Sequence, residues 1–254
     1  MIRIQRPVAV PNRLTVEGAA ADQKNRDDFD RSPQTYINLL VEFDIHNSIY
    51  GHPTVKTSLR EAQFGKCCFC EKDQREEDGA VEHFRPKKGY IEKRGLKMVK
   101  PGYFWLGYDW ENFLFCCKKC NGSKCKGNLF PLRPGSTRAR SHNNNLALED
   151  PYLIDPATID PSLHLYFDNE FIKFSSDYGQ ETIYVLRLDR PELTDFRSEH
   201  IVGLKMAIII LKTFPAQSQD AQDAKQFLRR AREPYSKFSA CAKTFIDNSG
   251  VDLS

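Results

Sequence analysis

The segments Cys67-Cys68-Phe69-Cys70 and Cys116-Cys117-Lys118-Lys119-Cys120 decide how this chain of 254 residues is expected to fold. Each segment holds two cysteines at the C-x-x-C spacing, which lets one tight turn present two thiolates to a tetrahedral ion. Two such turns supply the four ligands of one structural zinc site, and the matched set is Cys67, Cys70, Cys117 and Cys120. The register stays open, because a further cysteine adjoins each pair.

The remaining cysteines, Cys68, Cys116, Cys125 and Cys241, are predicted to be small buried apolar residues. A disulfide framework is not expected, because residues 1–6 lack the apolar stretch of a signal peptide and predict a reducing, cytoplasmic location. A redox role for the cysteine pairs is the alternative to zinc. That role needs only one pair and a neighbouring βαβ pattern, so the two pairs favour zinc.

Composition excludes several classes of protein. With 40% hydrophobic and 28% charged residues, the chain is neither disordered nor fibrous. The 37 Lys and Arg residues against 34 Asp and Glu give a net charge of +3, so any basic surface must be local. No apolar run approaches the ~20 residues that span a bilayer, and no membrane association is expected.

We expect an α+β chain in four parts. Residues 1–31 are polar and turn-rich, which predicts a loosely attached arm, and residues 32–66 predict a helical lead-in. Residues 67–131 hold the cysteine pairs and the candidate chemistry. Residues 132–254 predict a basic loop, a β-hairpin over residues 163–174 and helices over residues 193–214, 221–232 and 235–246.

Three fragments lie inside or just after the cysteine pairs: Glu82-His83-Phe84-Arg85-Pro86-Lys87, Trp110-Glu111-Asn112, and Asn121. Their order resembles the HNH nuclease family. The ββα-metal unit of that family carries an acidic residue and a histidine on its first strand, an asparagine mid-motif, and a histidine or asparagine on its helix. The cysteine pairs on either side of the motif match the branch of that family whose fold is stabilised by zinc. More narrowly, residues 82–87, 103–112 and 117–131 are similar to the PtuB family of Septu anti-phage systems, relatives of which accompany retrons.

The resemblance implies a role for each motif residue. His83 and Asn112 correspond to catalytic positions, with Asn112 orienting the loop or the histidine, and Glu82 and Asn121 correspond to the ligands of a catalytic metal. Glu82 stands where many HNH proteins have Asp, and Asn121 where many have His. These two departures leave the ligand distances and the metal preference open.

The chemistry of the residues agrees with these roles. Phosphodiester hydrolysis needs a nucleophilic water and stabilisation of charge on the phosphate oxygens. A neutral His83 can take the proton of the water, and the oxygen donors of Glu82 and Asn121 favour Mg²⁺ or Mn²⁺ over zinc. Because neighbours on a strand point in opposite directions, Glu82 and His83 share a site only if the backbone bends or the following helix supplies a second wall.

Basic residues around the motif are candidate nucleic-acid contacts, namely Arg85, Lys87, Lys88 and Lys124. Residues 87–100 carry six cations with Gly89 and Gly95 between them, which predicts a loop that follows phosphates, with a solvated surface as the alternative. Trp105 and Trp110 could stack on bases, but we expect them to pack in the core around the zinc site.

The function expected is therefore that of a metal-dependent HNH endonuclease of DNA or RNA, and the resemblance implies a role in anti-phage defence. It also implies a PtuA-like ATPase partner and, in retron relatives, a reverse transcriptase with its nucleic acid. The alternative is a zinc-ribbon adaptor that binds nucleic acid without cleaving it. The amphipathic helix over residues 221–232 and the arm before Arg31 are the expected docking elements for the ATPase.

Overall fold

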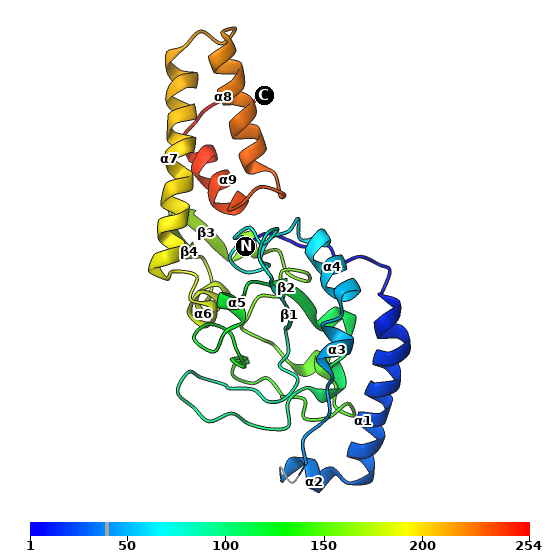
Figure 1. The fold of residues 1–254 in the computed structure, drawn as a ribbon. Helices are drawn as coiled ribbons and strands as arrows, with labels where there is room; N and C mark the ends of the chain where they lie inside the picture. The colour runs from blue at the N-terminus through cyan, green and yellow to red at the C-terminus, as the bar shows by residue number, and fades with distance from the viewer. Residues whose placement is uncertain (39–40) are drawn as a thin grey trace.

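The computed structural model describes residues 1–38 and 41–254, and Figure 1 shows the arrangement of the elements. The predicted residues Leu39 and Leu40 of the helical lead-in lie outside the described residues. The helices are a π-helical turn at Leu14–Gly18, then α1 Ala19–Arg31, α2 Pro33–Ile37, α3 Asn47–Tyr50, α4 Pro53–Ala62, α5 Lys118–Asn121, α6 Asp177–Leu186, α7 Pro191–Thr213, α8 Gln219–Arg232 and α9 Ser239–Asn248. The strands are β1 Ala80–His83, β2 Phe113–Cys116, β3 Leu165–Asp168 and β4 Phe171–Phe174. The chain is thus α+β, with two small antiparallel hairpins among helices.

The motif-bearing region is organised around the pair β1 and β2. They run antiparallel with Glu82 opposite Leu114 and His83 opposite Phe113. All four residues of β2 are buried, as a continuous apolar run of strand formers favours. Helix α5 follows β2 directly, so the order is strand, strand, helix. The assignment of this unit as a ββα-metal core stays a prediction.

The aromatic residues before β2 are core residues, as expected for the two tryptophans. Trp105 and Trp110 are each 4% exposed, and Tyr103 and Phe104 are fully buried. The strand begins after Asn112, which ends a short 3-10 helix over Trp110–Asn112. These rings fill the space between the motif and the N-terminal helices, so they are not available for base stacking.

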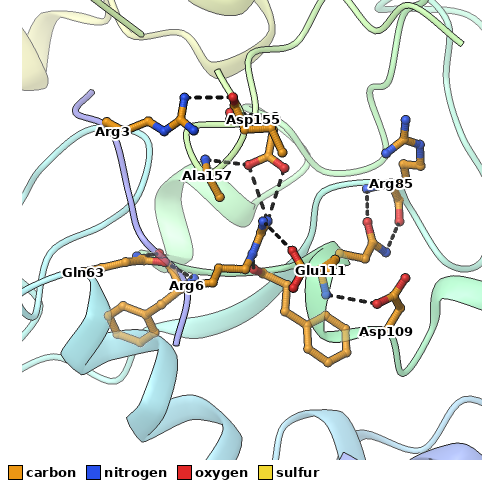
Figure 2. A network of polar contacts seen from close by, with 12 residues as sticks. Arg3, Arg6, Gln63, Arg85, Asp109, Glu111, Asp155 and Ala157 are labelled. Carbon is orange, nitrogen blue, oxygen red and sulfur yellow. Dashed lines mark hydrogen bonds and ion pairs between the residues drawn. The ribbon is translucent and has the colours of Figure 1, made fainter. Parts of the chain in front are cut away.

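The prediction of a loosely attached arm over residues 1–31 is wrong. Its second half forms the π-helical turn at Leu14–Gly18 and helix α1, and Phe29 is buried against the ring of Phe104 at 5.1 Å between centroids. Arg6 donates to the backbone oxygen of Phe113 in β2 at 3.1 Å and forms an ion pair with Asp155 at 3.2 Å. Figure 2 shows Arg6 between Asp155 and Glu111. The segment is anchored by a few buried apolar residues that lie far apart among charged ones. Its overall polar composition does not reveal them.

The C-terminal half matches its predicted elements. β3 and β4 form the expected hairpin, with Asn169 at its turn in the left-handed region at φ 52°. Helices α7 and α8 correspond to the predicted stretches over residues 193–214 and 221–232, whereas α9 begins at Ser239, later than the predicted residue 235. Helices α7 and α8 extend side by side away from the rest of the molecule (Figure 1). Within the described residues, none of the helices has the length and apolar character that a membrane crossing requires.

Candidate metal centre and active site

Four cysteine sulfurs converge in the centre of the chain. The Sγ atoms of Cys67, Cys70, Cys117 and Cys120 all lie within 4.8 Å of one another, and all four residues are buried. The Sγ atoms of Cys70 and Cys117 are 3.9 Å apart. A tetrahedral ion held by thiolates at about 2.3 Å requires sulfur–sulfur distances of about 3.8 Å, so the four residues fit zinc. The structure therefore selects the matched register from the doubled cysteines.

The other cysteines lie outside this cluster, as predicted. Cys68, Cys116, Cys125 and Cys241 are buried free thiols, none more than 3% exposed. Arg190 was not predicted to lie at this site, but its buried guanidinium donates to Sγ of Cys120 at 3.6 Å. A cation beside a thiolate cluster balances part of its charge and fixes the ligand, which is the usual function of residues just outside a metal site. Arg190 also ties the cluster to the start of α7.

A second site lies in a cavity of about 450 Å³, which is lined by residues of α3, β1 and α5. Glu82, His83 and Asn121 all line this cavity, so the structure brings the predicted acid, histidine and helix asparagine together. Among the described residues β1 pairs with β2 alone, so one of its edges carries no strand there, and all four residues of β1 reach the cavity. Their roles in catalysis stay a prediction.

The ring of His83 is held in one orientation. Its Nε2 lies 3.0 Å from the carbonyl oxygen of Gly107, and the ring packs edge-on against Tyr50 and Phe113. A carbonyl oxygen can only accept, so Nε2 carries the proton and Nδ1 keeps its lone pair. Burial, aided by the charge of Lys87, holds the pKa of His83 well below its usual value. The side chain is therefore a neutral base at pH 7.

Lys87 lies over the lone pair of His83. Its Nζ is 3.3 Å from Nδ1 of His83 and 4.3 Å from the centre of the Tyr50 ring. Desolvation lowers the pKa of Lys87 to about 8, although the nearby carboxylate of Glu82 opposes the shift. An ammonium at this place marks where an anionic group can bind beside the base.

Glu82 has a buried counterion that was not predicted from the sequence. Lys126 is fully buried, and its Nζ lies 2.5 Å from Oε1 of Glu82 and 2.9 Å from the backbone oxygen of His83. Burial raises the pKa of Glu82, and the charge of Lys126 opposes this effect. The second carboxylate oxygen, Oε2, makes no hydrogen bond within the described part of the chain. One signal could have found this pair, since a carboxylate on a buried strand requires a cation nearby.

Asn112 lies beside the site without lining the cavity. Its Oδ1 accepts from the backbone N–H of Arg85 at 2.7 Å, and its Nδ2 donates to the backbone oxygens of Arg85 and Leu106, each at 3.0 Å. These bonds join the loop after His83 to the loop that ends at Gly107, whose oxygen holds the histidine ring. The geometry fits an orienting residue.

The four predicted nucleic-acid contacts divide into two groups. Lys87 and Lys88 line the cavity. Arg85 instead pairs with the buried carboxylate of Glu149 at 2.9 Å and lies over the ring of Phe130. Its guanidinium therefore contributes to packing inside the protein. Lys124 is exposed and is not among the cavity residues. The sequence placed Arg85 two residues from His83 but could not show a partner 64 positions away.

Comparisons with known proteins find relatives among Septu and retron proteins. No protein-family model matches the chain. It is 39% identical over 158 residues to the Septu protein PtuB of Bacillus mycoides, which covers 59% of this chain and 52% of that protein. It is 28% identical over 136 residues to the Septu protein PtuA of the same organism, covering 53% of this chain and 19% of that protein. A Vibrio cholerae protein named as the candidate HNH endonuclease of retron Vc95 is 27% identical over 179 residues, or 68% of this chain and 74% of that protein.

The chain thus spans about half the length of the PtuB protein that it matches. The matched similarity extends over more than half of this chain in each case. This similarity makes the chain a relative of the Septu PtuB proteins and of a retron protein that is named as a candidate HNH endonuclease.

Proposed function

We propose that the chain is a metal-dependent HNH endonuclease that hydrolyses phosphodiester bonds in DNA or RNA. One observation supports this most strongly: His83, Glu82 and Asn121 line a single cavity, and the histidine is neutral with a lone pair on Nδ1. A base, an oxygen ligand and an amide at one place are what hydrolysis of a phosphodiester requires. An adaptor that only binds has no need of this combination.

In the proposed mechanism, His83 accepts a proton from the attacking water at Nδ1. The hydrogen bond from Nε2 to the oxygen of Gly107 strengthens as the ring becomes positive, and this stabilises the imidazolium. Lys87 must leave Nδ1 for the water to reach it, and a phosphate in the cavity offers Lys87 a stronger partner. Substrate binding would therefore expose the base.

The donors in the cavity fit a hard cation. Oε2 of Glu82 makes no hydrogen bond within the described residues, and Asn121, which carries an amide oxygen, lines the same cavity. These oxygen donors suit Mg²⁺ or Mn²⁺, whereas the thiolate cluster suits zinc. When bound, such a cation would stabilise the negative charge that develops on the phosphate and the leaving oxygen.

A basic loop beside the cavity is a candidate path for the nucleic-acid backbone. Residues 88–100 leave the cavity at Lys88, and their ends are joined by hydrogen bonds between Tyr90 and Val99. Arg94 anchors the loop by donating to the backbone oxygens of Cys125 and Val185. Lys93 and Lys97 are exposed, so a fixed loop can present their ammonium groups to a phosphate chain.

The low pKa of Lys87 predicts how binding depends on pH. If Lys87 contacts a phosphate, affinity for nucleic acid falls as the pH rises from 7 to 9, because the ammonium loses its proton near pH 8. The slope of log affinity against log salt should also shrink by about 0.7 to 0.9 over that range, the contribution of one phosphate contact. Fluorescence anisotropy without added divalent cations measures both. In Lys87→Arg the pH dependence should disappear, and a wild-type affinity that is constant across this range would contradict the contact.

The experiment that separates nuclease from adaptor is cleavage of a panel of single-stranded and duplex DNA and RNA with Mg²⁺ or Mn²⁺. A nuclease leaves shorter products that depend on the cation and on His83. An adaptor retains affinity and yields none.

We further propose that the nuclease acts in anti-phage defence with a PtuA-like ATPase that controls it. The similarity to a PtuB and to part of a PtuA protein of one organism supports a Septu-type pairing, and the retron relative leaves a reverse transcriptase and its nucleic acid as further partners. The surface of α7 and α8 supports docking, because Met206, Ile209 and Phe227 are each about half exposed on helices that extend from the body.

A single substitution tests the docking surface. Phe227→Glu should reduce co-purification with the ATPase by at least tenfold, because a charge replaces an exposed apolar anchor. Cleavage by the free chain should not change, since Phe227 lies outside the cavity. Asn248→Glu adds the same single negative charge at an exposed position at the end of α9 and provides the matched control. If the ATPase captures wild type and Phe227→Glu equally, the interface does not include Phe227.

A further inference from the structure

Lys126 is a fully buried lysine whose ammonium has two anchored partners. Its Nζ contacts Oε1 of Glu82 at 2.5 Å and the backbone oxygen of His83 at 2.9 Å, while its backbone N–H donates to the oxygen of Cys120 at 3.1 Å. Lys126 therefore joins the proposed cation ligand, the proposed base and the zinc-binding segment. A buried cation at such a place acts on the charge of the site as well as on its shape.

The first consequence is geometric. Oε1 of Glu82 is fixed by the ammonium, so the carboxylate cannot rotate freely, and Oε2 is the oxygen left for a cation. A carboxylate held through one oxygen presents the other in a defined direction, which is what support from outside the ligand shell provides in metal sites.

The second consequence is electrostatic. The charge of Glu82 is already balanced by Lys126, and the cavity walls carry four lysines against two acidic residues. A divalent cation that enters the cavity without an anion is therefore attracted only weakly. The reason is that the lysine ammonium groups repel it at short range in a partly desolvated site. A phosphate supplies the missing negative charge and further oxygen ligands.

We propose that Lys126 is a positioning residue that fixes Glu82 and lowers the cation affinity of the free cavity, so that the divalent cation and the phosphate bind together. This inference rests on the proposed function of Glu82 as a cation ligand. A purely structural lysine and a charge-setting lysine make opposite predictions for cation binding.

The test is the Mn²⁺ affinity of the full chain, measured from the electron paramagnetic resonance signal of free Mn²⁺. Lys126→Gln, which keeps a donor but removes the charge, should bind Mn²⁺ at least tenfold more tightly than wild type, and Lys126→Met should do the same. Lys126→Arg should resemble wild type. The gain should vanish in Lys126→Gln/Glu82→Gln, because the open oxygen is then no longer part of a carboxylate. Zinc content and circular dichroism identify the variants that fold, and Lys126→Gln carries the test if Lys126→Met does not.

Weaker or equal Mn²⁺ binding by folded Lys126→Gln overturns the proposal, as does an Arg variant that behaves like the Gln variant. A second measurement uses His83→Ala, which should bind an oligonucleotide without cleaving it. The oligonucleotide should raise Mn²⁺ affinity at least tenfold with Lys126 present and by a smaller factor in Lys126→Gln. If the oligonucleotide raises Mn²⁺ affinity by the same factor in both proteins, the proposal is also contradicted.

The two claims fail separately. If wild type cleaves no nucleic acid but the Mn²⁺ results hold, the charge-setting function of Lys126 stands and the nuclease assignment fails. If cleavage occurs while Mn²⁺ affinity drops in Lys126→Gln, the nuclease assignment stands and Lys126 is structural.

Discussion

His83→Ala is expected to lower the single-turnover rate of cleavage by about 10²- to 10⁴-fold, the range that a general base contributes. Affinity for nucleic acid should change little, because a base acts on the transition state more than on the bound substrate. Zinc content should also be unchanged, since His83 is not part of the cysteine cluster. Rapid mixing with end-labelled substrate, and anisotropy for binding, measure the two effects.

Two further variants guard against loss of folding, because the ring of His83 packs against Tyr50 and Phe113. His83→Asn fills part of the space and should be as slow as His83→Ala. His46→Ala removes an exposed histidine outside the cavity and should cleave at the wild-type rate. Cleavage at the wild-type rate by a folded His83→Ala protein would refute the assignment of the base.

Loss of one zinc ligand is expected to have the largest effect on stability. Cys70→Ser and Cys120→Ser should lose the metal and unfold the region around β1, β2 and α5, because structural zinc contributes roughly 10 kcal/mol or more to folding. Cys68→Ala removes a buried thiol next to the cluster but outside it, and should cost about 1 kcal/mol. Elemental analysis should find about one zinc per wild-type chain.

Thermal melting with and without a zinc chelator completes this comparison. The chelator should lower the melting temperature of wild type and of Cys68→Ala alike. A folded, active protein without zinc, or equal losses from Cys68→Ala and Cys70→Ser, would contradict the four-cysteine site.

Features with a local signal could be predicted from the sequence. The C-x-x-C spacing predicted the four converging cysteines, and the alternation around Asn169 predicted the hairpin β3–β4. Helix α4 lies in the predicted helical lead-in and begins at Pro53, because proline suits the first turn of a helix. Within each cysteine pair, at the hairpin turn and at the start of α4, the residues that decide the local geometry lie within a few positions of one another.

Features that depend on distant partners could not be predicted. Arg85 lies near His83 in sequence, but Glu149 takes its guanidinium. Lys124 and Lys126 look alike in the sequence, yet Lys124 is exposed and Lys126 is fully buried against Glu82. The polar composition of residues 1–31 concealed the anchoring of Arg6 and Phe29. Charged residues carry little information on burial until their counterions are known.

The central claim is that this cavity hydrolyses a phosphodiester bond with a water activated by His83. The most direct test is cleavage in ¹⁸O-labelled water with Mg²⁺ or Mn²⁺, followed by mass spectrometry of the products. Hydrolysis predicts one ¹⁸O atom in each new terminal phosphate formed by wild type, and very little product from His83→Ala. Products without the label, or equal product from both proteins, would contradict the claim.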